Sequence, residues 1–164
     1  MDATSQGIDA RGYLTGWLQG VTSMYLSDIR AIPEDKLSVS PGGAARSVDD
    51  ISVDALDLLT WTTEALKGNF ITEFDQEARK ARIASMNSHE AIAEAFNKAA
   101  EDMSAALAGA SDEALNGVIK TPFGMEMPLF MVATIAVNHI WYHDGQLNYF
   151  QALNGDSDIH WQMN

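Results

Sequence analysis

Two histidines four residues apart, His139 and His143, are the residues of this chain best suited to bind a metal ion. They lie in a long apolar segment that predicts a helix. On a helix, side chains at this spacing project from one face, with Cβ atoms about 5–6 Å apart. Both imidazoles can therefore reach one ion, because each metal–nitrogen bond is about 2.0–2.1 Å long. The pair indicates a metal site that needs a further ligand.

The histidine pair belongs to a stripe that we predict to face the protein core. The stripe has the spacing of one helix face and is apolar at both ends. Its members are Val132, Ala136, His139, His143, Gln146 and Phe150. Buried imidazole and amide groups need polar partners. A bound ion would satisfy the two histidines.

The predicted third ligand is Asp54, on an earlier helix. It belongs to a second one-face series, formed by Ser47, Ile51, Asp54, Leu58, Trp61 and Ala65. An unpaired buried carboxylate is costly, so Asp54 needs a cation, hydrogen bonds or a proton. Two histidines and one carboxylate suit zinc, nickel or ferrous iron, with coordination positions left open. Two metal-free alternatives stay open: Asp54 pairs with one histidine, or it lies at the edge of the stripe and reaches solvent.

Four amphipathic helical segments are predicted to position these residues. They cover about 9–31 and 47–67, a third segment that begins at Asn87 or Ser88, and about 128–153. Ser47 and Asp50 have the spacing of a capping box, with Asp in place of Glu. Residues 117–127 resemble a short hairpin with a turn at Pro122–Gly124. Four such helices without a long strand predict an all-α four-helix bundle, as one domain over residues 1–164.

Composition restricts the partners of this protein. The formal net charge of −13, from 23 acidic and 10 basic residues, argues against a nucleic-acid partner and against an anionic membrane surface. The chain has no cysteine, which excludes disulfides and thiolate ligands. The first seven residues lack the basic and apolar regions of a signal peptide, and no apolar run predicts a membrane span. We therefore expect a cytoplasmic protein.

Together these segments resemble the DinB/YfiT-like family of metal-dependent enzymes, which is unrelated to the DNA polymerase that shares part of that name. The resemblance covers nearly the whole chain. It is carried by Pro33-Glu-Asp-Lys-Leu37, by Pro41-Gly-Gly-Ala-Ala-Arg46-Ser-Val48, by Thr121-Pro-Phe-Gly124 and, most specifically, by His139-x3-His143-x-Gly145-Gln146. Family members place a metal-binding histidine seven residues after the serine that opens the second helix. Here that position is Asp54, so the chain departs from the three-histidine pattern.

The resemblance implies an up-down-down-up bundle that is frequently a homodimer. It also implies a metal-dependent transferase or isomerase that uses a small-molecule substrate and a low-molecular-weight thiol such as bacillithiol or mycothiol. Asp54, His139 and His143 would then hold the ion, with Gln146 supporting them. The alternative is a non-catalytic, dimeric, ligand-binding bundle in which the metal site is degenerate.

Overall fold

The computed structural model describes residues 9–73 and 75–161, and these form a helical bundle with a small two-stranded hairpin. The segment read for a signal peptide lies outside the described residues. The four long helices are α1 (Ala10–Ala31), α2 (Val48–Leu66), α4 (His89–Gly109) and α6 (Leu129–Leu153). Shorter elements are the 3₁₀ helix η1 (Glu34–Lys36), α3 (Gln76–Ser85), α5 (Asp112–Asn116), β1 (Val118–Lys120) and β2 (Glu126–Pro128). The predicted four-helix bundle and hairpin are confirmed.

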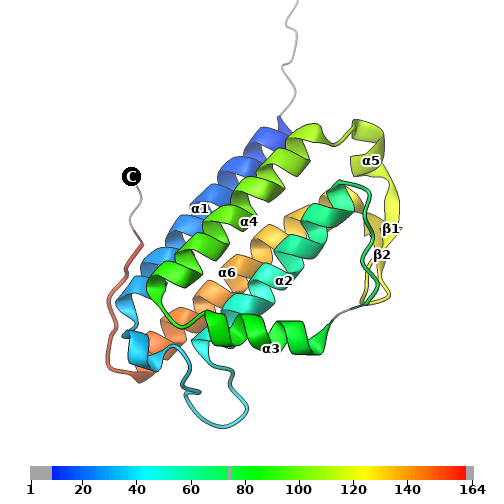
Figure 1. Cartoon of the computed structure of the whole chain (residues 1–164). Coiled ribbons are helices and arrows are strands. Elements are labelled where there is room, and N and C mark those ends of the chain that lie inside the picture. Colours follow the sequence, from blue (N-terminus) through cyan, green and yellow to red (C-terminus); the bar gives the residue numbers. More distant parts are fainter. Residues whose placement is uncertain (1–8, 74, 162–164) are drawn as a thin grey trace, which may run out of the picture.

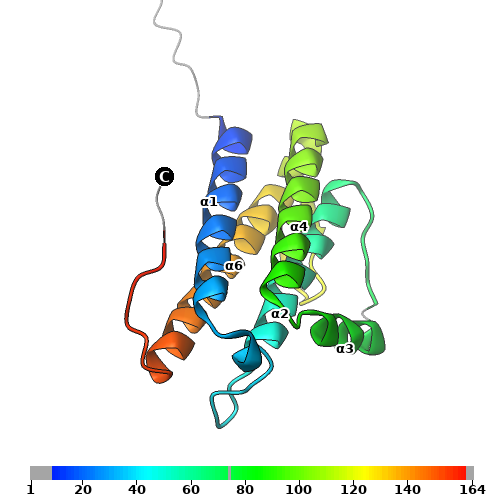
Figure 2. The ribbon, with the colours of Figure 1, turned by 60° about the vertical axis from the view of Figure 1, so that its left-hand side comes forward.

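The long helices form a ring in which α1 packs on α6, α6 on α2, α2 on α4 and α4 on α1. In the view of Figure 1, α1 and α6 run downward while α2 and α4 run upward. Two successive long helices, α2 and α4, are therefore parallel. The connection between them must return along the bundle, and α3 lies on this return path, crosswise at one end of the bundle (Figures 1 and 2).

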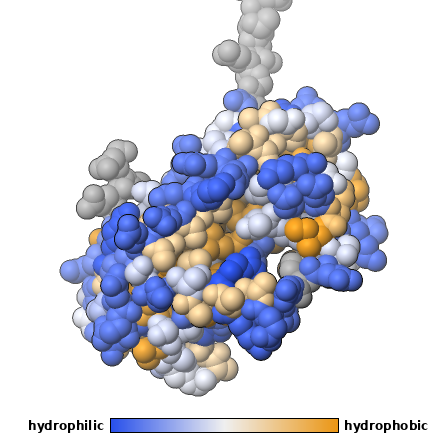
Figure 3. Space-filling view, viewed as in Figure 1, coloured by the Kyte–Doolittle hydropathy of each residue, from blue (hydrophilic) through white to orange (hydrophobic). Residues whose placement is uncertain are grey.

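One hydrophobic core fills the bundle, and it comes from the apolar stripes of the long helices. Its largest fully buried side chains include Tyr25, Phe96 and Leu18. Tyr25 stacks on Phe96 with ring centroids 4.6 Å apart, and its hydroxyl shares a hydrogen bond with Ser52 (2.8 Å). Charged and polar side chains cover most of the outer face drawn in Figure 3, in keeping with the large negative charge. Among the described residues, no helix is both long and apolar enough to cross a membrane.

The start of α2 differs from the prediction. Ser47 is the N-cap residue, but its hydroxyl makes no capping hydrogen bond to the helix backbone. It bonds instead to the carboxylate of Asp49, which also accepts from the backbone N–H of Asp50 (2.7 Å). The expected capping box is wrong, because Asp49 is the stronger acceptor within reach and Asp50 is used elsewhere. Asp50 pairs with Arg79 of α3 (2.7 Å).

A cluster of polar side chains lies inside the bundle, between α1 and α6. Asp28 and Asp144 are almost completely buried. Asp28 Oδ2 accepts from Asn148 Nδ2 (2.7 Å) and from Trp161 Nε1 (2.7 Å). The chain after α6 therefore returns along α1, where the indole of Trp161 also meets Trp141 with ring centroids 6.2 Å apart. We call Asp28, Asp144, Asn148 and Trp161 the inner acid cluster.

Candidate metal centre

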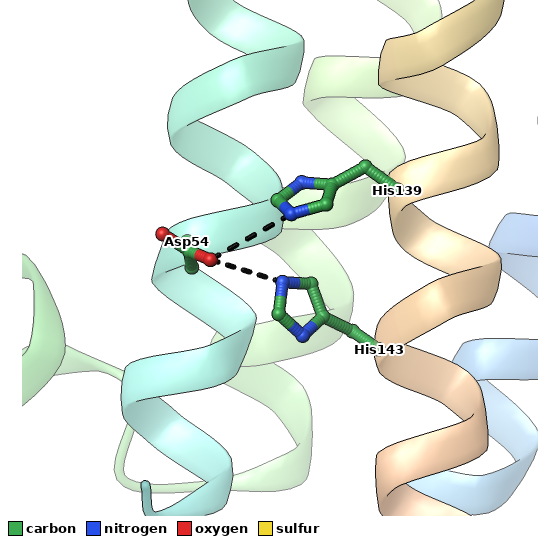
Figure 4. A group of neighbouring side chains, drawn as sticks. All are labelled: Asp54, His139 and His143. Carbon is green, nitrogen blue, oxygen red and sulfur yellow. Dashed lines mark hydrogen bonds and ion pairs between the residues drawn. The ribbon is translucent and has the colours of Figure 1, made fainter.

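The structure brings the three predicted ligands together at the seam between α2 and α6 (Figure 4). Asp54 Oδ2 lies 3.0 Å from His143 Nε2 and 3.7 Å from His139 Nε2. Two atoms that bind one ion at about 2.1 Å each lie no more than about 4.2 Å apart. Both distances are below this limit. Within the described chain, this is the one group of three or more histidine and acidic residues whose possible ligand atoms all lie within 4.8 Å of one another.

Helix geometry explains the convergence. His139 and His143 are one turn apart on α6, and their ring centroids are 4.4 Å apart. Asp54 projects from the middle of α2, toward both rings. His143 is completely buried, whereas the side chains of His139 and Asp54 keep 25% and 33% of their exposure. As predicted, the stripe on α6 faces the core at His143. The site is nevertheless open to solvent at Asp54 and His139.

Gln146 lies where the sequence predicts, behind His143. Nδ1–H of His143 donates to Gln146 Oε1 (2.8 Å), which turns Nε2 toward Asp54. An unprotonated Nε2 and a carboxylate oxygen 3.0 Å apart repel each other, so a proton or a metal cation must lie between them. A ligating histidine commonly has its second nitrogen fixed in this way. The donor set therefore fits a divalent ion.

Two arginines that were not predicted to be partners of Asp54 also contact it. Arg46 Nη2 lies 3.0 Å from Oδ2, and Arg79 Nη2 lies 3.9 Å from Oδ1. Asp54 thus belongs to an acidic row on α2 with Asp50 and Asp57, and this row faces α3. The spacing of the row, and the Arg-Lys-Ala-Arg run at 79–82, are signals from which this contact could have been predicted.

The charges around the site set the protonation of Asp54 and His139. The hydrogen bond to His143, and then Arg46, hold the pKa of Asp54 well below its usual range. Burial and the neighbouring His143 lower the pKa of His139. His139 Nδ1 is buried and has no hydrogen-bond partner among the described residues. At neutral pH the site therefore offers an ionised carboxylate and a neutral imidazole, which are the forms that bind metals.

A cavity of about 510 Å³ lies beside the site. Three of its lining residues contact the three candidate ligands: Arg46 contacts Asp54 (3.0 Å), Gln146 contacts His143 (2.8 Å), and Tyr142 lies nearly parallel to His139 with ring centroids 6.0 Å apart. Tyr142 lies directly before His143 in the sequence but is not a core residue. The tyrosine is in fact 60% exposed and forms a wall of this cavity.

Neither protein-family models nor curated proteins match the chain. Solved structures do match. A mycothiol-dependent maleylpyruvate isomerase has a TM-score of 0.63 at 16% identity, and a histidine-to-alanine mutant of it gives 0.63 at 17%. In each case 84% of this chain is covered, but the chain spans only 60% of the isomerase. A DinB-like protein from Bacillus cereus ATCC 10987 has a TM-score of 0.67 at 18% identity, over 88% of this chain and 91% of that one. The DinB-like fold expected from the sequence is thus confirmed.

Proposed function

We propose that this protein is a divalent-metal-dependent enzyme of the thiol-dependent transferase or isomerase type, with Asp54, His139 and His143 as metal ligands. The observation that carries the proposal is the position of Asp54 Oδ2, 3.0 Å and 3.7 Å from the two Nε2 atoms. Zinc, nickel and ferrous iron all accept two imidazoles and one carboxylate. This donor set leaves coordination positions for a substrate.

The remaining residues of the site have supporting roles. Gln146 fixes the ring of His143, and the neighbouring cavity offers room for a small molecule. A divalent ion bound there supplies Lewis acidity, which lowers the pKa of a thiol that reaches its open position. Because the chain has no cysteine, that thiol must be a separate molecule. The mycothiol dependence of a protein with this fold supports a low-molecular-weight thiol.

Metal analysis and thermal unfolding of protein without a histidine tag test the proposal. We expect one zinc or nickel ion per chain, and stabilisation of about 2.7 kcal/mol when free metal is a hundred times its Kd. His139→Ala should abolish both effects. His160→Ala is the control, since His160 is another partly exposed histidine that faces an acidic residue, Asp156 (2.9 Å), in the C-terminal segment. Wild-type protein that stays metal-free after supplementation would contradict the proposal.

One observation favours the alternative of a non-catalytic ligand-binding bundle. Arg46 and Arg79 already neutralise Asp54 without any metal. If the arginines have replaced the ion in this protein, chelators will leave the unfolding temperature of the wild type unchanged. The cavity beside the site would then bind its ligand without metal.

The exposed side of α6 supports the homodimer expected from the sequence. Met131 and Ile135 form a short exposed apolar row, one turn apart on α6 and outside the lining of the cavity, with 52% and 40% exposure. A second copy could cover this row, because contiguous exposed apolar surface favours association. Sedimentation of wild type and Ile135→Glu tests this, with a dimer expected for the wild type alone. The enzyme would act in the cytoplasm, where small thiols are kept reduced.

A further inference from the structure

The cavity beside the candidate metal centre has an unusual charge for this protein. Its walls are Pro41, Ala44, Ala45, Arg46, Val48, Ile51, Tyr142, Gly145, Gln146, Tyr149 and Phe150. Arg46 is the one charged residue among these lining residues, although acidic residues outnumber basic ones by 23 to 10 in the whole chain. A cationic wall without an acidic neighbour in the lining favours an anionic ligand, because the guanidinium of arginine matches a carboxylate.

Apart from the amide of Gln146, the rest of the wall is apolar or aromatic. Tyr142 and Tyr149 are 60% and 67% exposed, so flat hydrophobic surface is available to a ligand. The volume of about 510 Å³ lies in the range of small-molecule sites, about 300–1,000 Å³. Inorganic anions would leave these walls unused. An organic carboxylate with a flat apolar body would contact both Arg46 and the aromatic walls.

Arg46 is held by one residue of the candidate centre. Its Nη2 donates to Asp54 Oδ2 (3.0 Å), the same oxygen that faces His143 Nε2. A divalent cation held through this oxygen would take the negative charge that Arg46 now neutralises, and it would repel the guanidinium. Arg46 would then need another anion, and its side chain, 37% exposed, already borders the cavity.

We infer that Arg46 is the anion-binding residue of this cavity, that the ligand is a small organic carboxylate with a flat apolar body, and that metal at Asp54 strengthens its binding by releasing Arg46. The coupling between metal and anion rests on the proposed function. The assignment of Arg46 as the anion-binding residue does not, because it depends on the cavity alone.

Benzoate and its neutral isostere benzamide probe the full chain by calorimetry, with and without zinc. We expect benzoate to bind and benzamide to bind at least about tenfold more weakly, as for a lost hydrogen bond to a charged group. Zinc should strengthen benzoate binding by about 5–150-fold, the usual range of coupling between two sites. Arg46→Gln should remove at least about tenfold of the benzoate affinity in both states.

A matched control uses an arginine far from the cavity. Arg11, at the start of α1, pairs with Asp112 of α5, so Arg11→Gln also removes an ion-paired arginine. Its benzoate affinity should equal that of the wild type. Arg46→Lys, which keeps a charge without the planar guanidinium, should lie between the wild type and Arg46→Gln. Circular dichroism verifies that each variant is folded.

The release of Arg46 can be tested without metal. Asp54→Asn removes the charge that holds Arg46, so metal-free Asp54→Asn should bind benzoate more tightly than the metal-free wild type. Asp50→Asn is its control, because Asp50 pairs with Arg79 and not with Arg46. This arm is independent of zinc, so its result is separate from that of the proposed function.

Each result decides one point. If zinc does not bind, the proposed function is wrong. The benzoate titrations of the metal-free variants still test the role of Arg46. If zinc binds but leaves benzoate affinity unchanged, the coupling is wrong. Retention of zinc-dependent benzoate binding by Arg46→Gln would show binding to the ion alone and overturn the role of Arg46. Equal binding of inorganic phosphate, or no benzoate binding at millimolar concentration, overturns the ligand class.

Discussion

Two sites with carboxylates lie on different sides of helix α6, and the partners of these carboxylates differ in charge. Toward α2, His139 and His143 meet Asp54, which also contacts two guanidinium groups and is one-third exposed. Toward α1, Asp144 lies against Asp28 in the buried inner acid cluster, where amide and indole N–H groups are the donors. The arginine partners of Asp54 are cations, whereas the side chains that donate to Asp28 are neutral.

The protonation of the two carboxylates follows from these partners. The pKa of Asp54 is lowered by its hydrogen bond to His143 and by Arg46. Burial, and then the charge of Asp28, raise the pKa of Asp144 to about 8. Asp54 is therefore ionised at neutral pH and available to a metal, whereas Asp144 is protonated and is not. Adjacent residues, His143 and Asp144, thus belong to the candidate metal centre and to the inner acid cluster, respectively.

Of the substitutions that test this difference between the two sites, we expect Asp28→Ala to change the free energy of unfolding most. Asp28→Ala removes the acceptor of Asn148 and Trp161, and each donor left unpaired costs about 1–3 kcal/mol. We expect a loss of about 2–4 kcal/mol in the free energy of unfolding, measured with urea. Asp35→Ala, at an exposed acid of η1, is the control. A loss at Asp28 no greater than this control would show that the inner acid cluster is not structural.

The pH dependence of stability should separate the two carboxylates next. A carboxyl whose folded pKa is raised contributes stability that is complete below its unfolded pKa, near 3.8, and is lost as pH rises through about 8. Asp144 should therefore destabilise the protein across this window, with a slope of up to about 1.4 kcal/mol per pH unit. Asp144→Asn should lose this slope in urea unfolding at several pH values. An unchanged slope would contradict a neutral Asp144.

A smaller effect is expected where α3 meets the acidic row of α2. Arg79 pairs with Asp50 (2.7 Å) and Asp57 (3.2 Å) at 25% exposure. Arg79→Ala should lower the free energy of unfolding by about 1 kcal/mol, and 1 M salt should reduce the difference because partly exposed pairs are screened. Lys80→Ala, whose pair with Glu77 is largely exposed, should change little. A salt-independent loss at Arg79 would indicate lost packing instead.

The smallest effect concerns the titration of His139, which NMR can follow. Its pKa should lie below the ordinary 6.5, so the stability it contributes is present above 6.5 and is lost as pH falls through the lowered value. Asp54→Asn should lower this pKa further, because the Asp54 charge favours the imidazolium. Asp50→Asn serves as the comparison. A His139 pKa above 6.5 would place the ring outside the influence of burial and His143.

Apolar periodicity was sufficient to predict the long helices and to bring together the three candidate ligands. The predicted limits of α1, α2 and α6 agree with the structure to within one residue, since Pro128 precedes α6 by a single position. Asp54, His139 and His143 could be brought together because each interrupts an apolar stripe at helical spacing. A polar residue in such a stripe must find a partner.

The same method missed elements that have no apolar stripe. Helix α3 buries none of its residues, although Gln-Glu-Ala-Arg-Lys-Ala-Arg is rich in helix formers and Asp75 caps it by accepting from two backbone N–H groups. Arg79, one of the two arginines that contact Asp54, was missed for the same reason, since it comes from this helix. The burial of Asp28 could have been predicted, because Asp28 follows Val21 and Tyr25 at the spacing of one helix face on α1. Which acid faces which partner depends on the ring order of the helices, which periodicity alone does not give.

The attachment of α3 has a consequence for motion. Only Ile83 of this helix packs, in part, against the core, and the other attachments are guanidinium–carboxylate pairs. Detachment would therefore expose little apolar surface, and segments with few buried contacts open well below the free energy of global unfolding. Amide hydrogens of residues 76–85 should exchange with deuterium long before those of α2. The carboxylate of Asp54 would then be uncovered on this side by a local opening that leaves the bundle intact.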